Sequence, residues 1–381
     1  MKFFVCVFLF SNIALADDLR EIHIGLASNF SEVSTGSSNP YGGYFKGGVD
    51  LALKKAEPKL RSRGIILKTL EFDYGNTDIK VLDAARKAIA SDVIAVIGYN
   101  YSSNALLAAP LHHEAKLPMI TPSATANRLG QLGRYIHMGA FDNAFMGETL
   151  ARIARNRLKA AKVVLLPAGN CAYCSDLADS FAREFQKQGG SIAYNLPVLS
   201  EDKDFSGIVQ KLKGLEYDLI FIPNQELTSA RMIAALSKAG IKKPFMGADG
   251  WGNVGQEFFG ILGEGNFTGY STSHWHPDLN DSASKEFISA YVKLYAKTPN
   301  DTSVLAYDST LLLVESILAA KDFTRESIED SLNKLKSFRG VTGQFILSPN
   351  RAPEKSLVLL KTESHKFKIV EVISPKNRKA L

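Results

Sequence analysis

Cysteine is scarce in this chain, and neither charge dominates. Only three of the 381 residues are cysteines. Cys171 and Cys174 have no further cysteine close by, so they are too few for a closed zinc site. The formal net charge is a mild +6, and no basic stripe is interleaved with aromatic residues. This composition argues against both a structural zinc site and nucleic-acid binding.

Long apolar runs are confined to the start of the chain. Met1-Lys2 precedes the apolar stretch Phe3–Phe10, and Ala14-Leu15-Ala16 forms a small-x-small site ahead of two aspartates. This order predicts a secretory signal peptide over residues 1–16, cleaved after Ala16. No other run reaches the ~20 apolar residues that a membrane-spanning helix needs. We therefore expect an exported protein without stable membrane insertion.

Cleavage after Ala16 would remove Cys6. The two cysteines that then remain, Cys171 and Cys174, are spaced C-x-x-C. In a cytosolic βαβ protein this spacing would point to redox chemistry. In an oxidising compartment it also fits a small structural disulfide, and two reduced, inert thiols are a third possibility. Export favours the disulfide between Cys171 and Cys174.

Strand-like and helix-like segments alternate along the chain, and 45% hydrophobic with 22% charged residues is typical of a globular protein. The expected strands are 21–27, 65–72, 93–98, 118–121, 162–167, 191–198, 218–223, 244–247, 343–347, 356–362 and 366–373. The expected helices are 41–55, 78–90, 102–115, 142–158, 175–188, 205–215, 227–239, 282–296, 301–319 and 325–338. This rhythm predicts an α/β fold with parallel sheets covered by helices on both faces.

The number of βα units is too large for one simple doubly wound sheet, and the rhythm restarts near residues 139–143. We therefore predict two Rossmann-like lobes with parallel central sheets, joined by a hinge that the chain crosses three times. Lobe one takes residues 17–140 plus 271–342, lobe two takes 141–270 plus 343–375, and 376–381 form a basic tail. A cleft between such lobes is the natural ligand site.

Several short segments match catalytic or cofactor-binding motifs, but the residues around them do not fit those functions. The G-x-G-x-x-G at Gly250–Gly255 lies deep in the chain, and Tyr270–Trp275 lacks the acid that a dinucleotide site requires. A tight loop opening a helix explains it better. The S-x-x-K matches at 282–285 and 331–334 have no K-T-G partner, and His112-His113-Glu114 lacks a second zinc-ligating histidine. We expect no enzyme activity, no cofactor and no metal.

Three loops that follow strands are rich in hydroxyl and acidic side chains, at 99–104, 121–127 and 247–251. Ligands of open parallel sheets lie beyond the carboxyl ends of the strands. Free amides at a helix start favour a carboxylate, and the Ser102 hydroxyl can complete its shell. Alone, Ser102 also fits a plain N-cap and Asp249 a turn residue. Together the loops indicate a site for an anion in one lobe. Facing it, they indicate an acidic side chain that can bind a cation.

Four phrases resemble one family in order and spacing: Val96–Ser103, Leu117–Thr125, Asp204–Val209 and Lys243–Gly250. With them the chain resembles the type I periplasmic binding proteins, especially the leucine/isoleucine/valine-binding proteins of branched-chain amino acid importers. The resemblance covers nearly the whole mature chain. It is more specific for the family than for the ligand.

The resemblance implies a set of ligand contacts. In lobe one, Ser102 matches the serine that binds the ligand carboxylate, and Ser123 and Thr125 match the loop that holds carboxylate and ammonium. Tyr41 matches an aromatic residue of the pocket wall. In lobe two, Tyr173 matches a tyrosine that closes over the ligand, and Asp249 replaces the glutamate that pairs with the ammonium.

Several positions depart from the leucine-type pattern. Gln225 stands where those proteins have a second tyrosine, Thr302 replaces a phenylalanine, and Tyr101 replaces a cysteine. These departures imply a more polar side-chain pocket than a leucine site has.

The resemblance implies a periplasmic solute-binding protein that captures an amino acid-like ligand and delivers it to the permease of an ABC importer. A binding protein for amides, ureas or small carboxylic or aromatic acids would share the fold without needing Asp249. A ligand-sensing ectodomain would share even the ligand. An enzyme is the least favoured alternative.

Overall fold

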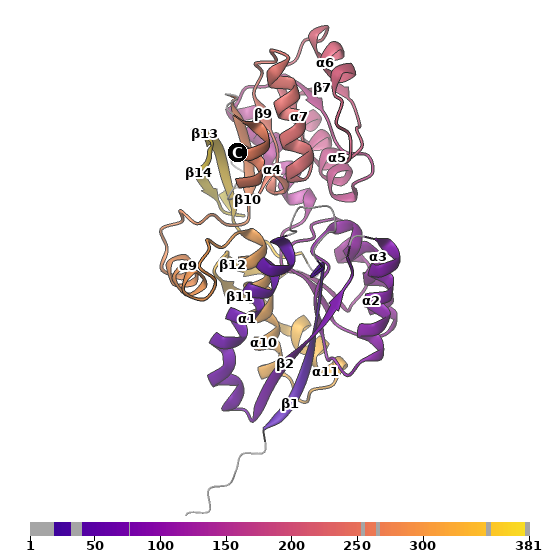
Figure 1. Ribbon diagram of the computed structural model, residues 1–381, viewed down its shortest axis with the longest axis vertical. Helices are drawn as coiled ribbons and strands as arrows, with labels where there is room; N and C mark the ends of the chain where they lie inside the picture. Colours follow the sequence, from indigo (N-terminus) through magenta and orange to yellow (C-terminus); the bar gives the residue numbers. More distant parts are fainter. Residues whose placement is uncertain are drawn as a thin grey trace, which may run out of the picture.

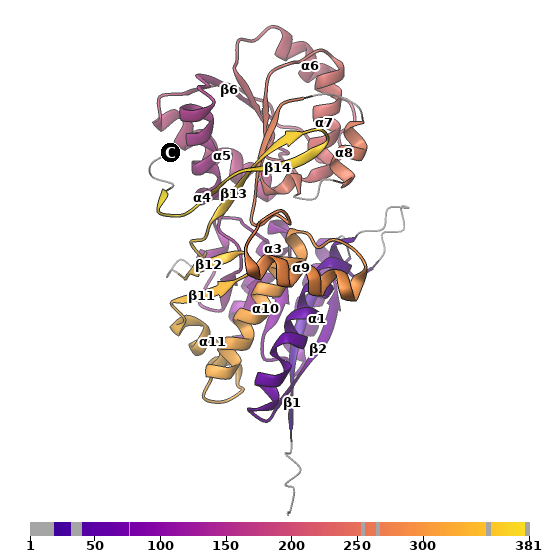
Figure 2. The same ribbon diagram turned by 90° about the vertical axis from the view of Figure 1, so that its left-hand side faces the viewer.

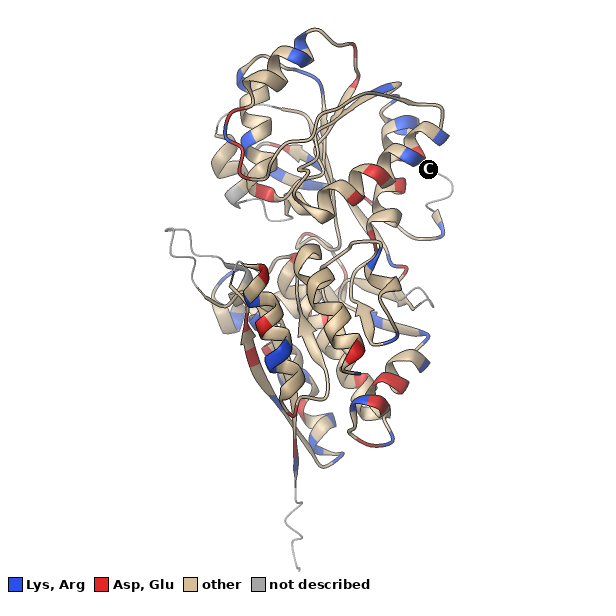
Figure 3. Cartoon of the chain, turned by 90° about the vertical axis from the view of Figure 1, so that its right-hand side faces the viewer, with Lys and Arg blue, Asp and Glu red and all other residues tan. Residues whose placement is uncertain are grey.

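The computed structural model describes residues 19–31, 40–75, 77–252, 256–263, 267–347 and 352–377. Within these ranges the chain forms two α/β lobes that follow one another along the long axis of the molecule (Figure 1). The predicted signal peptide and residues 378–381 of the predicted basic tail lie outside the described residues. Basic and acidic side chains are interspersed over both lobes (Figure 3).

The sheet of lobe one has five parallel strands in the order β2-β1-β3-β4-β5. Its strands are β1 (Arg20–Ser28), β2 (Ile65–Asp73), β3 (Val96–Gly98), β4 (Met119–Thr121) and β5 (Ile136–Met138). Its helices are α1 (Pro40–Arg61), α2 (Asp78–Ala90), α3 (Ser102–Glu114), α10 (Asp301–Ala319) and α11 (Arg325–Lys334). Apolar residues of β1 pack with α1 and α10 in one cluster, and α2 and α3 pack together in another. The sheet is therefore covered on both faces.

Helix α10 is the core helix of lobe one. Among the described residues it is the one helix whose length and apolarity would suffice to cross a membrane, but 78% of that stretch is buried inside the protein. Its apolar character is thus explained by packing against α1, with which it forms an extensive contact.

The sheet of lobe two has the order β14-β13-β10-β9-β8-β6-β7. Its strands are β6 (Lys162–Leu165), β7 (Ser191–Asn195), β8 (Leu219–Phe221), β9 (Phe245–Met246), β10 (Gly269–Ser273), β13 (Leu357–Glu363) and β14 (Lys366–Ile373). Its helices are α4 (Asn143–Arg152), α5 (Ala172–Lys187), α6 (Ser206–Lys213), α7 (Glu226–Lys238) and α8 (Gln256–Leu262). Strands β6 to β10 are parallel, whereas β13 and β14 add an antiparallel edge. A further helix, α9 (Ser282–Tyr295), packs against α1 of lobe one.

Two of the three lobe boundaries predicted from the sequence need correction. The segment 343–347 does not join the second sheet, because β12 (Gly343–Ile346) pairs with β11 (Ser337–Gly340) in a separate hairpin. This hairpin lies beside α10 (Figure 2), where the buried Asp308 carboxylate accepts N–H bonds from Val341 and Thr342, both at 2.8 Å. The predicted helix 325–338 accordingly ends at Lys334. The boundary 270/271 falls inside β10, which belongs to the second sheet.

The chain passes between the lobes after β5, after β10 and before β13. We call these segments the first, second and third crossing. They carry Phe141, His274 and Lys355 respectively, and all three side chains are buried. The predicted number of crossings is therefore found. The predicted boundary 140/141 falls within the first crossing, whereas the second and third crossings lie after the predicted boundaries 270/271 and 342/343.

Candidate functional site

A strained turn opens the lobe-one half of the site. Tyr99 follows β3 with a φ of 54°, a conformation that is unusual for a bulky residue and persists only where the surroundings enforce it. Its N–H donates to the Ala27 carbonyl at 2.9 Å, and its carbonyl accepts the Thr121 hydroxyl at 3.0 Å. Its own hydroxyl lies 3.1 Å from Nε2 of the buried His112. These contacts fix the turn so that α3 begins at Ser102.

Ser102 joins two loops of lobe one. Its buried Oγ accepts the backbone N–H groups of Thr125 and Ala126, each at 3.2 Å. The N-cap of α3 is Tyr101, which makes no side-chain capping bond, so Ser102 is not the plain N-cap that its sequence context allows. With two N–H groups accepted, the hydroxyl hydrogen of Ser102 is left to donate to a further acceptor.

The other two hydroxyls of this half are used differently. Ser123 donates to the carbonyl of Asn100 at 3.0 Å, so its hydroxyl holds the loops together. The Thr125 Oγ1 is buried and has no hydrogen-bond partner within the described part of the chain. A buried hydroxyl without a partner is costly and calls for an explanation. A bound ligand would supply the missing partner.

In lobe two an acidic side chain is held on both of its oxygens. Tyr173, on the first turn of α5, donates its hydroxyl to Asp249 Oδ1 at 2.6 Å and accepts the N–H of Gly250 at 3.0 Å. Asp249 Oδ2 lies 3.1 Å from Nε2 of His274. The Asp249 side chain keeps 13% of its surface exposed, so the carboxylate is fixed in direction and still accessible.

One buried asparagine links the two halves. The N–H of Asn143, at the start of α4, donates to the Thr125 carbonyl at 2.8 Å. Its side-chain Nδ2 lies 3.3 Å from the Tyr173 carbonyl. Phe141, two residues earlier, packs on the His274 ring with 4.1 Å between ring centroids. Residues at the first crossing therefore contact both Thr125 of the lobe-one half and Tyr173 and His274 of the lobe-two half.

A second contact between the lobes lies beside this link. Asn127 of lobe one donates both its backbone N–H and its Nδ2 to the Asp176 carboxylate of α5, each at 2.7 Å. Asp176 lies one helical turn beyond Tyr173. The loop that carries Thr125 is therefore tied to the helix that carries Tyr173.

The two cysteines form a disulfide in the structure. Cys171 is the N-cap of α5, and its Sγ accepts the Cys174 N–H at 3.2 Å. The bridge encloses Tyr173 within the first turn of the helix. The alternative of two reduced thiols therefore does not describe this structure.

The remaining predicted residues are less closely tied to this group. Gln225 is the half-buried N-cap residue of α7, and Thr302 is buried in the first turn of α10. Tyr41 lies in the first turn of α1, and its side chain lies outside what the structure describes. Sequence reasoning missed Asn143 and His274, because neither stands in a recognisable motif.

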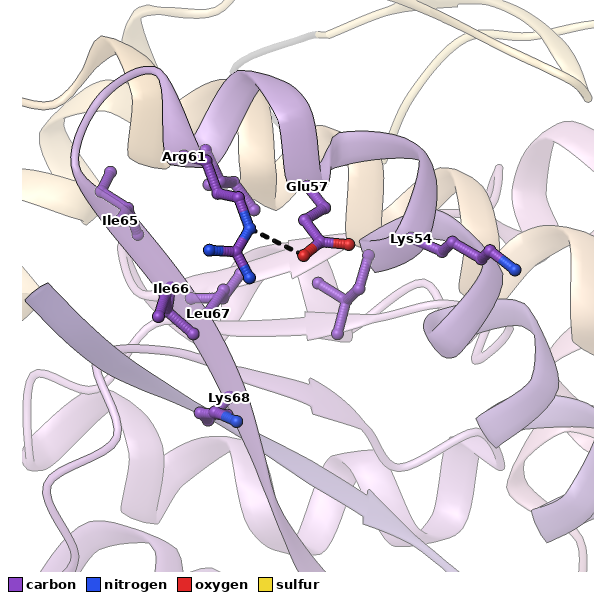
Figure 4. A pocket seen from close by; sticks show the side chains of 9 residues that line it. Lys54, Glu57, Arg61, Ile65, Ile66, Leu67 and Lys68 are labelled. Carbon is purple, nitrogen blue, oxygen red and sulfur yellow. Dashed lines mark hydrogen bonds and ion pairs between the residues drawn. The ribbon is translucent and has the colours of Figure 1, made fainter. Parts of the chain in front are cut away.

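A surface hollow of about 220 Å³ lies elsewhere, between α1 and β2 (Figure 4). Its lining residues are Leu53, Lys54, Glu57, Leu60, Arg61, Ile65, Ile66, Leu67 and Lys68. It contains the Glu57–Arg61 ion pair, with 2.8 Å between Oε1 and Nε, and it includes none of the candidate site residues. Within the described residues, no cluster of three or more His, Cys, Asp or Glu side chains could hold a metal ion.

Comparison with known proteins gives one family. The profile of the periplasmic binding protein family matches residues 21–366. The Leu/Ile/Val-binding protein of Escherichia coli K12 is 25% identical over 251 residues, which cover 65% of this chain and 66%, just under two thirds, of that relative.

Two solved structures are similar over nearly the whole chain. A leucine-binding protein from Thermotoga maritima has a TM-score of 0.85 and 25% identity, with 93% of this chain and 99% of that chain covered. A branched-chain amino acid transporter substrate-binding protein from Streptococcus pneumoniae, in complex with isoleucine, has a TM-score of 0.83 and 27% identity, with 93% and 100% covered.

Proposed function

Because this chain belongs to the periplasmic binding protein family, we propose that it captures a free amino acid between its lobes and delivers it to an ABC importer. The predicted family and the predicted two-lobed α/β fold are confirmed by the profile match and by the structural similarity. The ligand, the permease and export to the periplasm are parts of the proposal.

The observation that carries the proposal is the opposed chemistry of the two halves. Lobe one presents the Ser102 hydroxyl and the Thr125 hydroxyl that lacks a partner among the described residues, together with helix-start amides. Such dipoles favour a carboxylate. Lobe two presents Asp249, an oriented carboxylate that favours an ammonium group. A zwitterion satisfies both halves at once.

The mechanism is binding followed by closure. The ligand first docks on Ser102, Ser123 and Thr125, and lobe two then rotates about the three crossings to bring Tyr173 and Asp249 onto it. Closure excludes water, which strengthens the charge pairing. We expect micromolar or tighter affinity, about −8 kcal/mol or better.

The side chain of the ligand is expected to be more polar than leucine. The half-buried Gln225 and the buried Thr302 replace the aromatic residues that the resemblance places in leucine-type pockets. An apolar side chain would leave polar groups of the pocket without partners, which costs affinity.

Isothermal titration tests the proposal after copurified ligand has been removed by unfolding and refolding. The protein is titrated with each common amino acid and, in parallel, with benzoate, acetamide and urea. Heat with an amino acid is the expected result. Heat only with benzoate, acetamide or urea would replace the amino acid by that class, and heat with none of the compounds would overturn the proposal.

Two further measurements separate the remaining alternatives. Loss of uptake of the bound amino acid on deleting the gene supports a transport role, whereas unchanged uptake would favour a sensor ectodomain. Mature protein that begins at Asp17 would show export with cleavage after Ala16.

A further inference from the structure

His274 is placed to control the candidate ligand acid. It follows β10 on the second crossing and is buried, with 2% of its surface exposed. Its Nε2 lies 3.1 Å from Asp249 Oδ2, while the other oxygen of Asp249 accepts the Tyr173 hydroxyl. The Phe141 ring packs against its face. Among the described residues, the imidazole therefore has one hydrogen-bond partner, Asp249, and it also packs against one aromatic neighbour.

The surroundings of the second ring nitrogen indicate the protonation state. Nδ1 of His274 is buried and has no hydrogen-bond partner in the part of the chain that the structure describes. An imidazolium carries N–H groups on both nitrogens, so protonation would leave a buried charged donor unpaired, at a substantial cost. The geometry fits a neutral ring with its proton on Nε2.

The surroundings of His274 shift its pKa in opposite directions. Burial is the largest influence and lowers the pKa of His274, the Asp249 carboxylate opposes this change, and the buried Lys355 ammonium of the third crossing reinforces it. Asp301, at the start of α10, accepts a hydrogen bond at 2.6 Å from the hydroxyl of Ser273, the residue that precedes His274. Burial raises the pKa of Asp301 to about 8, which keeps that carboxyl from adding a negative charge that would favour imidazolium.

We propose that His274 is a positioning residue that donates a neutral N–H to Asp249 and so orients the carboxylate without cancelling its charge. This inference rests on the proposed role of Asp249 in binding a cationic ammonium group. A lysine or an imidazolium at this position would form an ion pair with Asp249 and compete with the ligand. A neutral donor leaves the negative charge of Asp249 to the ligand.

The first test needs no ligand and is independent of the proposed function. Nitrogen-15 NMR of the histidine side chains, with His274→Gln used for assignment, reports the tautomer in the free protein. We expect neutral His274 with its proton on Nε2 at about pH 7, above the lowered pKa. A doubly protonated ring, or a proton on Nδ1, would overturn the inference even if no amino acid binds.

The second test measures the dissociation constant against pH with the amino acid identified by titration. His274→Gln supplies a neutral donor, so we expect affinity within about threefold of wild type at neutral pH, whereas His274→Leu should bind at least about tenfold more weakly. On acidification the wild type should lose affinity as His274 protonates, and His274→Gln should lose less.

His276→Gln is the matched control, because His276 is a buried neighbour whose Nδ1 lies 3.7 Å from an oxygen of Asp278 rather than beside Asp249. It should keep the wild-type pH profile, and circular dichroism shows whether each variant folds. A His274→Leu variant that folds and binds like wild type, or equal acid sensitivity of wild type and His274→Gln, contradicts the inference. If Asp249→Asn leaves affinity unchanged, the proposed role of Asp249 itself is wrong.

Discussion

The two halves of the site are built in different ways. The lobe-one half uses neutral hydroxyls and amides of neighbouring loops, and the bond from Thr125 N–H to Ser102 Oγ joins residues 23 positions apart. The lobe-two half depends on one formal charge, and Asp249 lies 76 positions from Tyr173 and 25 from His274. The carboxylate is bonded on both oxygens before a ligand arrives, whereas the buried Thr125 Oγ1 has no partner in the described residues. One half is thus preorganised, and the other becomes complete on binding.

Removing the charge of the lobe-two half should have the largest effect. We expect Asp249→Asn to weaken amino acid binding by about 2–5 kcal/mol, because it removes one partner of a desolvated charge pair. Isothermal titration at neutral pH measures this change. Asp278→Asn is the control, since that carboxylate is 75% exposed and should leave affinity unchanged. Equal affinities of the two variants would contradict the ammonium-pairing role.

Acid should lower the stability of the lobe-one half, in which the buried His112 contacts the Tyr99 hydroxyl. Burial lowers the pKa of His112 to about 4 from an ordinary 6.5. Between these values the unfolded chain binds a proton that the folded protein does not, so stability falls as pH falls through this window. The loss amounts to roughly 3 kcal/mol at most.

Urea denaturation at about pH 7 and about pH 4 measures this sensitivity for wild type and His112→Gln. The variant should lose less stability on acidification, because glutamine does not titrate in this window. An equal loss in both proteins would show that His112 is not the group responsible.

A smaller effect should separate ligand contact from structural support within lobe one. Thr125→Val removes a hydroxyl without a partner among the described residues, so we expect affinity to fall by about 1–2 kcal/mol while the unfolding free energy does not fall. Thr121→Val removes a hydroxyl that bonds the Tyr99 carbonyl and should lower stability. Titration and urea denaturation of both variants test this contrast, and a Thr125→Val variant with unchanged affinity would mean that the hydroxyl does not touch the ligand.

Much of the architecture could be predicted from local pattern. The helix 78–90 and the strand 366–373 have the predicted bounds, because their apolar periodicity and their turn residues agree. The return of 343–347 to the second sheet was mispredicted, because what decides its pairing is the contact between Val341, Thr342 and the distant Asp308. A strand pattern gives no information about its pairing partner.

The candidate site likewise contains residues that could be predicted from the sequence and residues that could not. The hydroxyl-rich loop around Ser102 could be found from the sequence because a strand end, a polar cluster and a helix start follow one another directly. The roles of Tyr173 and Asp249 came from the family resemblance rather than from spacing. Asn143 and His274 act through partners that only the folded chain brings close, so no local signal marks them.

Lys355 on the third crossing has a consequence for how the lobes move. Its buried Nζ lies 2.5 Å from the Thr342 hydroxyl and 4.1 Å from the centre of the Phe345 ring. This buried cation therefore anchors residue 355 to the β11–β12 hairpin of lobe one, two residues before β13 begins at Leu357. The Ser273–Asp301 bond anchors the end of β10 in the same manner. The two anchored segments lie side by side, because Ser273 pairs with Val358 in the second sheet, so we expect the lobes to rotate about an axis that passes close to both.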